Sequence, residues 1–190
     1  PDVLIKFAKN QNRKLGPMEA QLLATHLGTD LSKAVKEVEK LCLVTGDDNT
    51  ITSDLIHRFV GINKDYNVFE LQNAIGSRNT MKAMKIAHFF ATDQKNNPLP
   101  VTIAILNGYF AKVMAVHGLR GKSPQEMASA MKVPPFFVND YIAHARNYSQ
   151  GKLVSIQRDL RDCDLRSKGV GGDGGDPGEL LRELIAKVMA

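Results

Sequence analysis

The sequence predicts an all-α protein made of two helical bundles. Apolar residues recur three and four positions apart along almost the whole chain, which is the spacing of a helix face, and the period-two alternation of a half-buried strand is almost absent. Clusters of glycine, proline and asparagine divide the chain into segments of helical length. With 190 residues, of which 43% are hydrophobic, the chain has enough apolar side chains for the cores of two small domains. No β-sheet is expected.

The first bundle is expected to cover residues 1–62. Its clearest helix spans residues 30–45, whose apolar side chains fall on one face while lysine and glutamate take the other. That apolar face consists of Leu31, Ala34, Val35, Val38, Leu41 and Cys42. Two shorter helices, at about 3–10 and 17–26, precede it. Thr52 predicts the N-cap of a fourth helix, which carries Leu55, Ile56, Phe59 and Val60.

The second bundle is expected to cover residues 67–190. It follows a short polar stretch at 61–66, which has no periodicity and marks a domain boundary. The run 101–116 is apolar over most of its circumference and is expected to be the central helix. The glycine-rich stretch 169–176 is expected to form a flexible loop. Helix-start signals stand at five places: Asn67, Asn79, Pro98 with Pro100, Ser123 with Pro124 and Glu126, and Asp176 with Pro177 and Glu179.

Composition limits the class of protein. The net charge of +5 is compatible with a place near nucleic acid, but the basic residues are dispersed and are expected to be the solvated sides of helices. Cys42 and Cys163 stand apart with no CxxC partner, which favours a reducing cytoplasm over a disulfide framework or a zinc site. No apolar run approaches the roughly 20 residues that cross a bilayer, so no membrane contact is expected. Because the chain opens at Pro1, inside an expected helix, it is expected to be a piece of a longer protein.

The sequence offers no catalytic, metal-binding or cofactor-binding residues. The glycine-rich stretch lacks the GK[ST] ending of a phosphate-binding loop and follows no strand. No serine or cysteine stands in a nucleophile motif. The histidines are scattered without the spacing of metal ligands: His26, His57, His88, His117 and His144. For an enzyme of another type, the sequence suggests no catalytic residues.

One segment supports an alternative function, a helix-turn-helix DNA-binding regulator. A capped short helix, a turn at 133–135 and a second helix at 136–148 follow one another between Ser123 and Tyr148. Lys132 and Arg146 are its candidate DNA contacts. The second helix is rich in apolar residues and is expected to serve packing instead.

Four groups of residues together resemble one family, the delta subunit of the bacterial DNA polymerase III clamp loader. The first two are G-x-D-L with E-x-x-K-L, at Gly28 to Leu41, and N-V-F-x-L-x-x-A-I, at Asn67 to Ile75. The third is the block Ala128 to Pro135 with Phe137 and Val138 after it, in which Met131 stands where a leucine is usual. The fourth is Leu160, Asp164, Lys168 and Gly169. The four groups resemble the family in their order and spacing, and together they cover nearly the whole chain.

The resemblance implies that residues 1–62 are the helical lid of an AAA+ module and that residues 67–190 are the helical collar. The domain that contacts the sliding clamp would lie upstream of Pro1. Motor subunits of such loaders carry a phosphate-binding lid arginine, whereas Leu31 stands in that place here and cannot donate to phosphate. The chain is therefore expected to have no ATPase site of its own, although its family belongs to a DNA polymerase, a nucleotidyltransferase holoenzyme.

The implied function is mechanical: the chain supports assembly of the loader and loading of the clamp during DNA replication. Its expected partners are the gamma/tau-type and delta-prime-type subunits, the clamp through the upstream domain, and DNA only indirectly. The last helix is expected to supply the subunit interface, because its apolar stripe exceeds the needs of one core. That stripe consists of Leu180, Leu181, Leu184, Ile185 and Val188.

Overall fold

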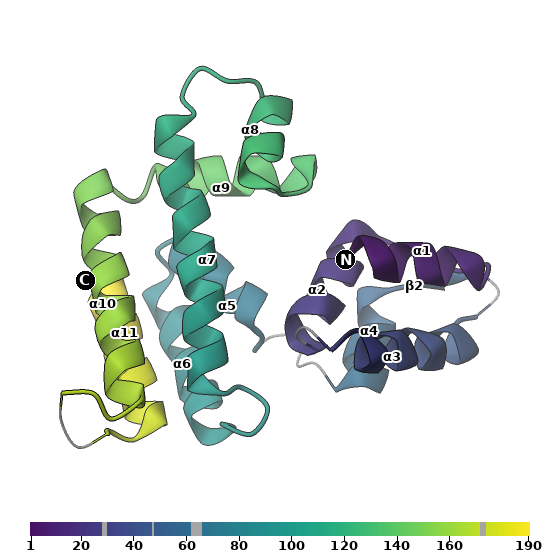
Figure 1. Ribbon diagram of the computed structural model, residues 1–190, viewed down its shortest axis with the longest axis horizontal. Helices are drawn as coiled ribbons and strands as arrows, with labels where there is room; N and C mark the ends of the chain where they lie inside the picture. The colour runs from purple at the N-terminus through teal and green to yellow at the C-terminus, as the bar shows by residue number, and fades with distance from the viewer. Residues whose placement is uncertain (28–29, 47, 62–65, 172–173) are drawn as a thin grey trace. The chain divides into compact units, whose positions relative to one another are not determined.

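The chain folds into two compact helical units, Pro1–Asn67 and Val68–Ala190, called unit 1 and unit 2 below. A computed structural model describes residues 1–27, 30–46, 48–61, 66–171 and 174–190 (Figure 1). Helices make up most of both units, which confirms the predicted all-α class. The predicted boundary stretch and glycine-rich loop lie partly outside the described residues, at 62–65 and 172–173.

The described residues of unit 1 form four helices, two of which begin at a side-chain N-cap. The side chain of Asp30 accepts from the Lys33 amide, and that of Thr52 accepts from the Leu55 amide, so each satisfies a backbone donor that the first turn leaves free. The helices are α1 (Asp2–Asn10), α2 (Pro17–Leu27), α3 (Leu31–Val44) and α4 (Ser53–Val60).

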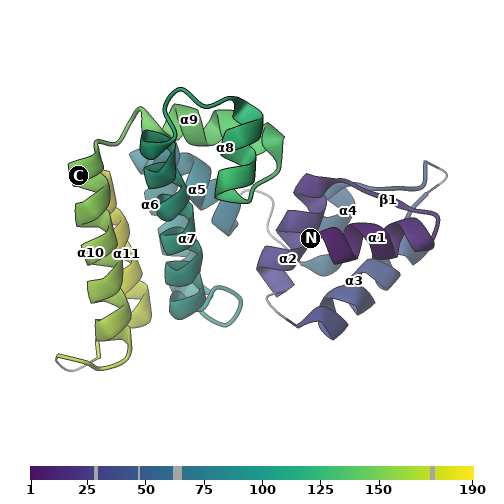
Figure 2. The same cartoon turned by 45° about the horizontal axis from the view of Figure 1, so that its top comes forward.

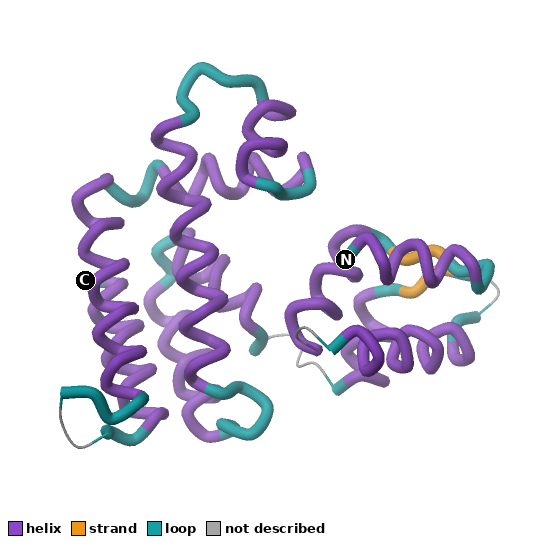
Figure 3. The backbone as a smooth tube through the Cα atoms, in the orientation of Figure 1, coloured by secondary structure: helices purple, strands orange, loops and turns teal. Residues whose placement is uncertain are grey.

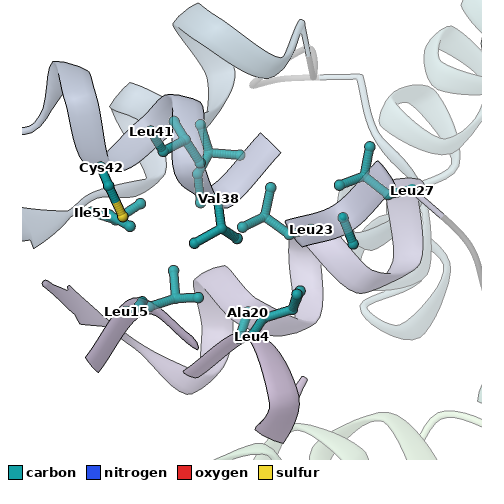
Figure 4. Close-up of a cluster of buried hydrophobic side chains, with 12 residues drawn as sticks. Leu4, Leu15, Ala20, Leu23, Leu27, Val38, Leu41, Cys42 and Ile51 are labelled. Atoms are coloured by element: carbon teal, nitrogen blue, oxygen red, sulfur yellow. The ribbon is translucent and has the colours of Figure 1, made fainter. Parts of the chain in front are cut away.

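The core of unit 1 lies between the facing sides of these helices (Figure 4). Leu23, Val38 and Leu41 are completely buried. Burying a side chain of this size stabilises a fold by about 1.5–3 kcal/mol, so each of these residues contributes to the stability of this unit. Leu31, at the start of the same stripe, is instead 52% exposed.

A two-stranded parallel sheet in unit 1 corrects the expectation of no sheet (Figure 3). Strands β1 (Lys14–Leu15) and β2 (Thr50–Ile51) pair in the register Lys14–Thr50 and Leu15–Ile51. The Arg13 side chain, next to β1, donates two hydrogen bonds: from Nε to the Cys42 carbonyl oxygen at 3.2 Å and from Nη1 to Asn49 Oδ1, next to β2, at 2.5 Å. Two residues per strand are too few to produce a sequence periodicity.

Unit 2 contains the remaining helices, and several begin at the predicted signals. Ser123 and Glu126 form a reciprocal capping box, and Asn79 and Asp176 each accept from a backbone amide three residues on. Ser149, which was not among the predicted signals, caps α10 in the same way. The elements are α5 (Val68–Gly76), α6 (Thr80–Thr92), α7 (Leu99–Gly118), α8 (Pro124–Met131), the 3-10 turn η1 (Pro135–Phe137), α9 (Val138–Ala145), α10 (Gln150–Ser167) and α11 (Pro177–Met189).

The long helices α6, α7, α10 and α11 lie side by side, and α8 and α9 lie across one end of them (Figures 1 and 2). Phe90 and Phe110 are buried at the centre of this bundle. Gly178 lets α11 approach α6 closely, because a Cβ atom there would stand 2.8 Å from the Cβ of Ala91.

Helix α7 is long and apolar enough to cross a membrane by length and composition alone, contrary to the expectation that no run approaches that length. Less than half of its most apolar stretch is buried in the unit. The buried half is an ordinary core face, on which Leu106, Phe110 and Val113 have no exposed surface.

Candidate subunit interface

The last helix, α11, does not present its apolar stripe to solvent. Each of the five residues predicted to contact a partner is at most 2% exposed, because α11 packs against α6 and α10 of the same unit. The interpretation of this stripe as a surplus over the needs of one core was therefore wrong. The residues concerned are Leu180, Leu181, Leu184, Ile185 and Val188.

Helix α7 carries the apolar surface that this unit leaves uncovered. In both views α7 lies in front of α6, with no other helix of unit 2 before it (Figures 1 and 2). Seven residues of α7 share one helix face: Val101 is 49% exposed, Ala104 and Ala111 are also exposed, and the other four are partly exposed. We call this helix face the outer face of α7; it consists of Val101, Ala104, Ile105, Gly108, Ala111, Lys112 and Ala115.

Gly108 lies in the middle of this face. Close packing within the described part of the chain does not explain why this residue is a glycine. A Cβ atom built there meets nothing within 4 Å. Glycine inside a helix costs about 0.5–1 kcal/mol relative to alanine. At Gly76, by contrast, a Cβ atom would stand 2.4 Å from the Cγ of His144 and from the Oη of Tyr109. Gly76 is thus explained by close packing inside unit 2, whereas Gly108 would be explained by the approach of something outside it.

The spacing along the outer face is that of a helix-pairing seam. Val101, Ala104, Gly108, Ala111 and Ala115 follow one another at intervals of three and four residues, which is the repeat that keeps one side of a helix against a partner helix. Alanine and glycine at such positions allow two backbones to approach closely. The chemical fit is therefore to another α-helix.

One cation interrupts the outer face. The Nζ of Lys112 lies 3.4 Å from the carbonyl oxygen of Gly108. Among the residues that the structure describes, no carboxylate forms an ion pair with it. Burial of its stem lowers the pKa of Lys112 below its ordinary value, because a partly desolvated ammonium is less stable than one in water.

A polar network holds the inner side of α7 in place. The Oη of Tyr109 lies 3.0 Å from the Nδ1 of His144 on α9. Burial raises the pKa of Tyr109 and lowers that of His144, where the charge of Asp140 partly opposes the shift. Both shifts favour the neutral forms, and a neutral phenol and a neutral imidazole share this bond with either group as donor, according to the tautomer of His144. Asn147, two residues beyond the end of α9, donates from Nδ2 to the Gly76 carbonyl oxygen at 2.8 Å, so α5 is bonded to the segment that follows α9.

The predicted helix-turn-helix segment exists as α8, η1 and α9, but α9 is used for packing. Its Val138 and Ala145 are buried, and its His144 bonds to α7. The two candidate DNA contacts, Lys132 and Arg146, are both exposed. Nothing in the structure brings DNA to them, so this role stays a prediction.

The described part of the chain offers no set of side chains for a metal ion. No group of three or more histidine, cysteine or acidic side chains is close enough to hold a metal ion. Leu31, which stands where motor subunits are expected to carry an arginine, points an apolar side chain into solvent. Gly28 and Thr29 of the same element lie outside the described residues.

An all-helical unit whose longest helix turns an apolar side outward is typical of proteins that pack against other chains. The family model for the DNA polymerase III delta subunit, C-terminal domain, matches residues 65–180. The chain belongs to this family, which confirms the resemblance seen in the sequence.

Two relatives extend the match beyond that domain. The DNA polymerase III subunit delta of Bacillus subtilis is 29% identical over 187 residues, which cover 97% of this chain and 52% of the relative. The solved structure of the Bacillus subtilis DNA clamp loader delta protein superposes with a TM-score of 0.63 at 27% identity, over 99% of this chain and 55% of that one. The chain thus spans about half the length of these relatives.

Proposed function

We propose that this chain is the assembly half of a clamp-loader delta subunit, in which unit 2 packs against the collars of sister subunits through the outer face of α7. Unit 1 acts as the lid of an AAA+ module, and the boundaries of the two domains are those expected from the sequence, 1–62 and 67–190. The partners are gamma/tau-type and delta-prime-type subunits in the cytoplasm. DNA and the sliding clamp are reached through the rest of the loader, and the function is the loading of the clamp during replication.

The observation that carries this proposal is the open glycine on an apolar helix face. Gly108 has space for a side chain inside its own unit, and its neighbours Ala104 and Ala111 are small and exposed. A helix that contacted only water at this face would be more stable with alanine at position 108 and more soluble with charged residues beside it. A closely packed partner helix explains both features.

The lid has no catalytic role in this proposal. Leu31 has no hydrogen-bond donor on its side chain and cannot bind the phosphates of ATP, so unit 1 transmits movements of neighbouring subunits through packed contacts instead of hydrolysing nucleotide. An arginine substituted at this one position is not expected to create ATPase activity.

The test is assembly of the full-length protein with the gamma/tau-type and delta-prime-type subunits of the same loader. Gly108→Trp places a large side chain on the outer face, at a position where an added Cβ atom meets nothing within 4 Å, so the variant should fold normally and fail to co-purify with its partners. Lys95→Trp, an exposed position on the loop before α7, is the control and should assemble like the unaltered protein. Normal assembly of a folded Gly108→Trp protein would count against the proposal.

A further inference from the structure

We infer that the helix covering the outer face of α7 belongs to a different subunit and presents a carboxylate to Lys112, so that Lys112 selects this partner over a second copy of the chain. This inference rests on the proposed function, because it concerns the face through which unit 2 is proposed to assemble. Lys112 is the one charged residue among the seven that make up the face.

The position of Lys112 makes its charge matter to any helix that packs there. Lys112 lies beside the seam, about one helical turn after Gly108 and one turn before Ala115. A partner helix that approaches Gly108 closely removes water from the amine, whose acceptor among the described residues is the Gly108 carbonyl oxygen at 3.4 Å. An ammonium that loses water needs a compensating acceptor, and an ionised one forms the stronger bond. The matching partner residue is an aspartate or a glutamate.

A second copy of the chain fits this face poorly. Two parallel α7 helices would bring both Lys112 ammonium groups to the same level. Because Lys112 lies one turn beyond Gly108, the middle of the seam from Val101 to Ala115, two antiparallel helices that cross at Gly108 would leave them about 12 Å apart along the axis, at 1.5 Å per residue. Like charges at such a distance repel each other in a partly buried contact. The apolar seam alone would permit self-pairing, and Lys112 opposes it.

The distribution of net charge between the two units favours an acidic partner surface. Unit 1 has 9 Lys and Arg against 9 Asp and Glu, whereas unit 2 has 16 against 11, so the whole net charge of +5 lies on unit 2. Complementary charge speeds the encounter of two surfaces and excludes wrong partners.

The experiment compares Lys112→Met and Lys112→Glu in the full-length protein, with Lys95→Met and Lys95→Glu as controls. With the gamma/tau-type and delta-prime-type subunits, Lys112→Glu should weaken assembly by about 30-fold or more, the range for a charge left facing a desolvated like charge. Lys112→Met should weaken it less. Alone, Lys112→Met should self-associate about tenfold more tightly than the unaltered protein in sedimentation equilibrium, while both Lys95 variants should behave like the unaltered protein.

Two results separate this inference from the function on which it rests. If Lys112→Glu assembles normally while Gly108→Trp does not, the face is the interface but the inference about its charge is overturned. If neither variant affects assembly, the outer face of α7 is not the subunit interface, and the proposed function is overturned. Restoration of the Lys112→Glu complex by an acid-to-lysine substitution in a partner's collar would support the inference and identify the facing residue.

Discussion

Replacing Gly76 by alanine should strongly destabilise unit 2, and the structure gives the size of the effect. The added methyl group would stand 2.4 Å from the Cγ of His144 and from the Oη of Tyr109, whereas carbon atoms in contact normally lie about 3.5–4.0 Å apart. One or both side chains must therefore move by more than about 1 Å, which breaks the 3.0 Å bond between them.

Three contributions set the magnitude. Overpacking costs about 1–3 kcal/mol, and a buried polar pair left unbonded costs about 1–3 kcal/mol more. The better helix propensity of alanine returns about 0.5–1 kcal/mol. We expect a net loss of about 1–5 kcal/mol, whose middle corresponds to a melting temperature lower by about 10 °C for a unit of this size.

The assay is thermal unfolding of the 190-residue chain followed by tyrosine fluorescence. The chain has no tryptophan, and three of its four tyrosines, Tyr109, Tyr141 and Tyr148, lie in unit 2, so the signal reports chiefly on that unit. Gly108→Ala is the matched control and should raise the melting temperature by a few degrees. Equal melting temperatures for the Gly76→Ala protein and the unaltered chain would refute the reasoning about close packing.

Three further outcomes follow from the same contacts. Leu184→Ala, in the core of unit 2, should lower stability by about 2–5 kcal/mol but leave assembly intact while the protein is folded; loss of assembly in a fully folded variant would return α11 to the interface. Stability should fall as the pH drops below about 6.5, the ordinary pKa of histidine, because the lowered pKa of His144 means that the unfolded chain takes up the proton first. The slope of unfolding free energy against pH between 7 and 5 should flatten in His144→Gln, and an unchanged slope would exclude this residue as the cause. Charge reversal at both Lys132 and Arg146 should leave loader assembly unchanged and cause no loss of salt-dependent DNA affinity in the isolated chain, whereas such a loss would favour the helix-turn-helix alternative.

The sequence predicted most helix starts correctly because caps depend on neighbouring residues alone. Thr52 and Asp176 each sit at the expected N-cap and accept from the amide three residues on. Capping satisfies backbone groups within one turn, so a short stretch of sequence contains the information. The paired strands at Lys14 and Thr50 were not predicted, because two-residue strands have no detectable period and their partners are far apart in the chain.

The direction in which each apolar stripe faces was the harder question. The stripe of α11 and the outer face of α7 both read as apolar, but α11 is buried in its own unit and the outer face is not. Helical periodicity identifies an apolar face without saying whether the same chain or another one covers it. The signal that could have separated them was present: the run 101–116 is apolar over most of its circumference, and only one side of a helix in a small bundle can face the core.

The accessibility of a thiol placed on the outer face of α7 tests the account most directly. Burial raises the pKa of Cys163 to about 11 and also raises that of Cys42, so both native thiols in this chain react slowly. A cysteine at exposed Ala111, in full-length protein with the upstream cysteines replaced, would dominate maleimide labelling. We predict that its labelling rate falls at least tenfold when the loader is assembled, while a cysteine at Lys95 keeps its rate. Equal rates at Ala111 in the free and assembled protein would contradict the proposal that this face meets a partner.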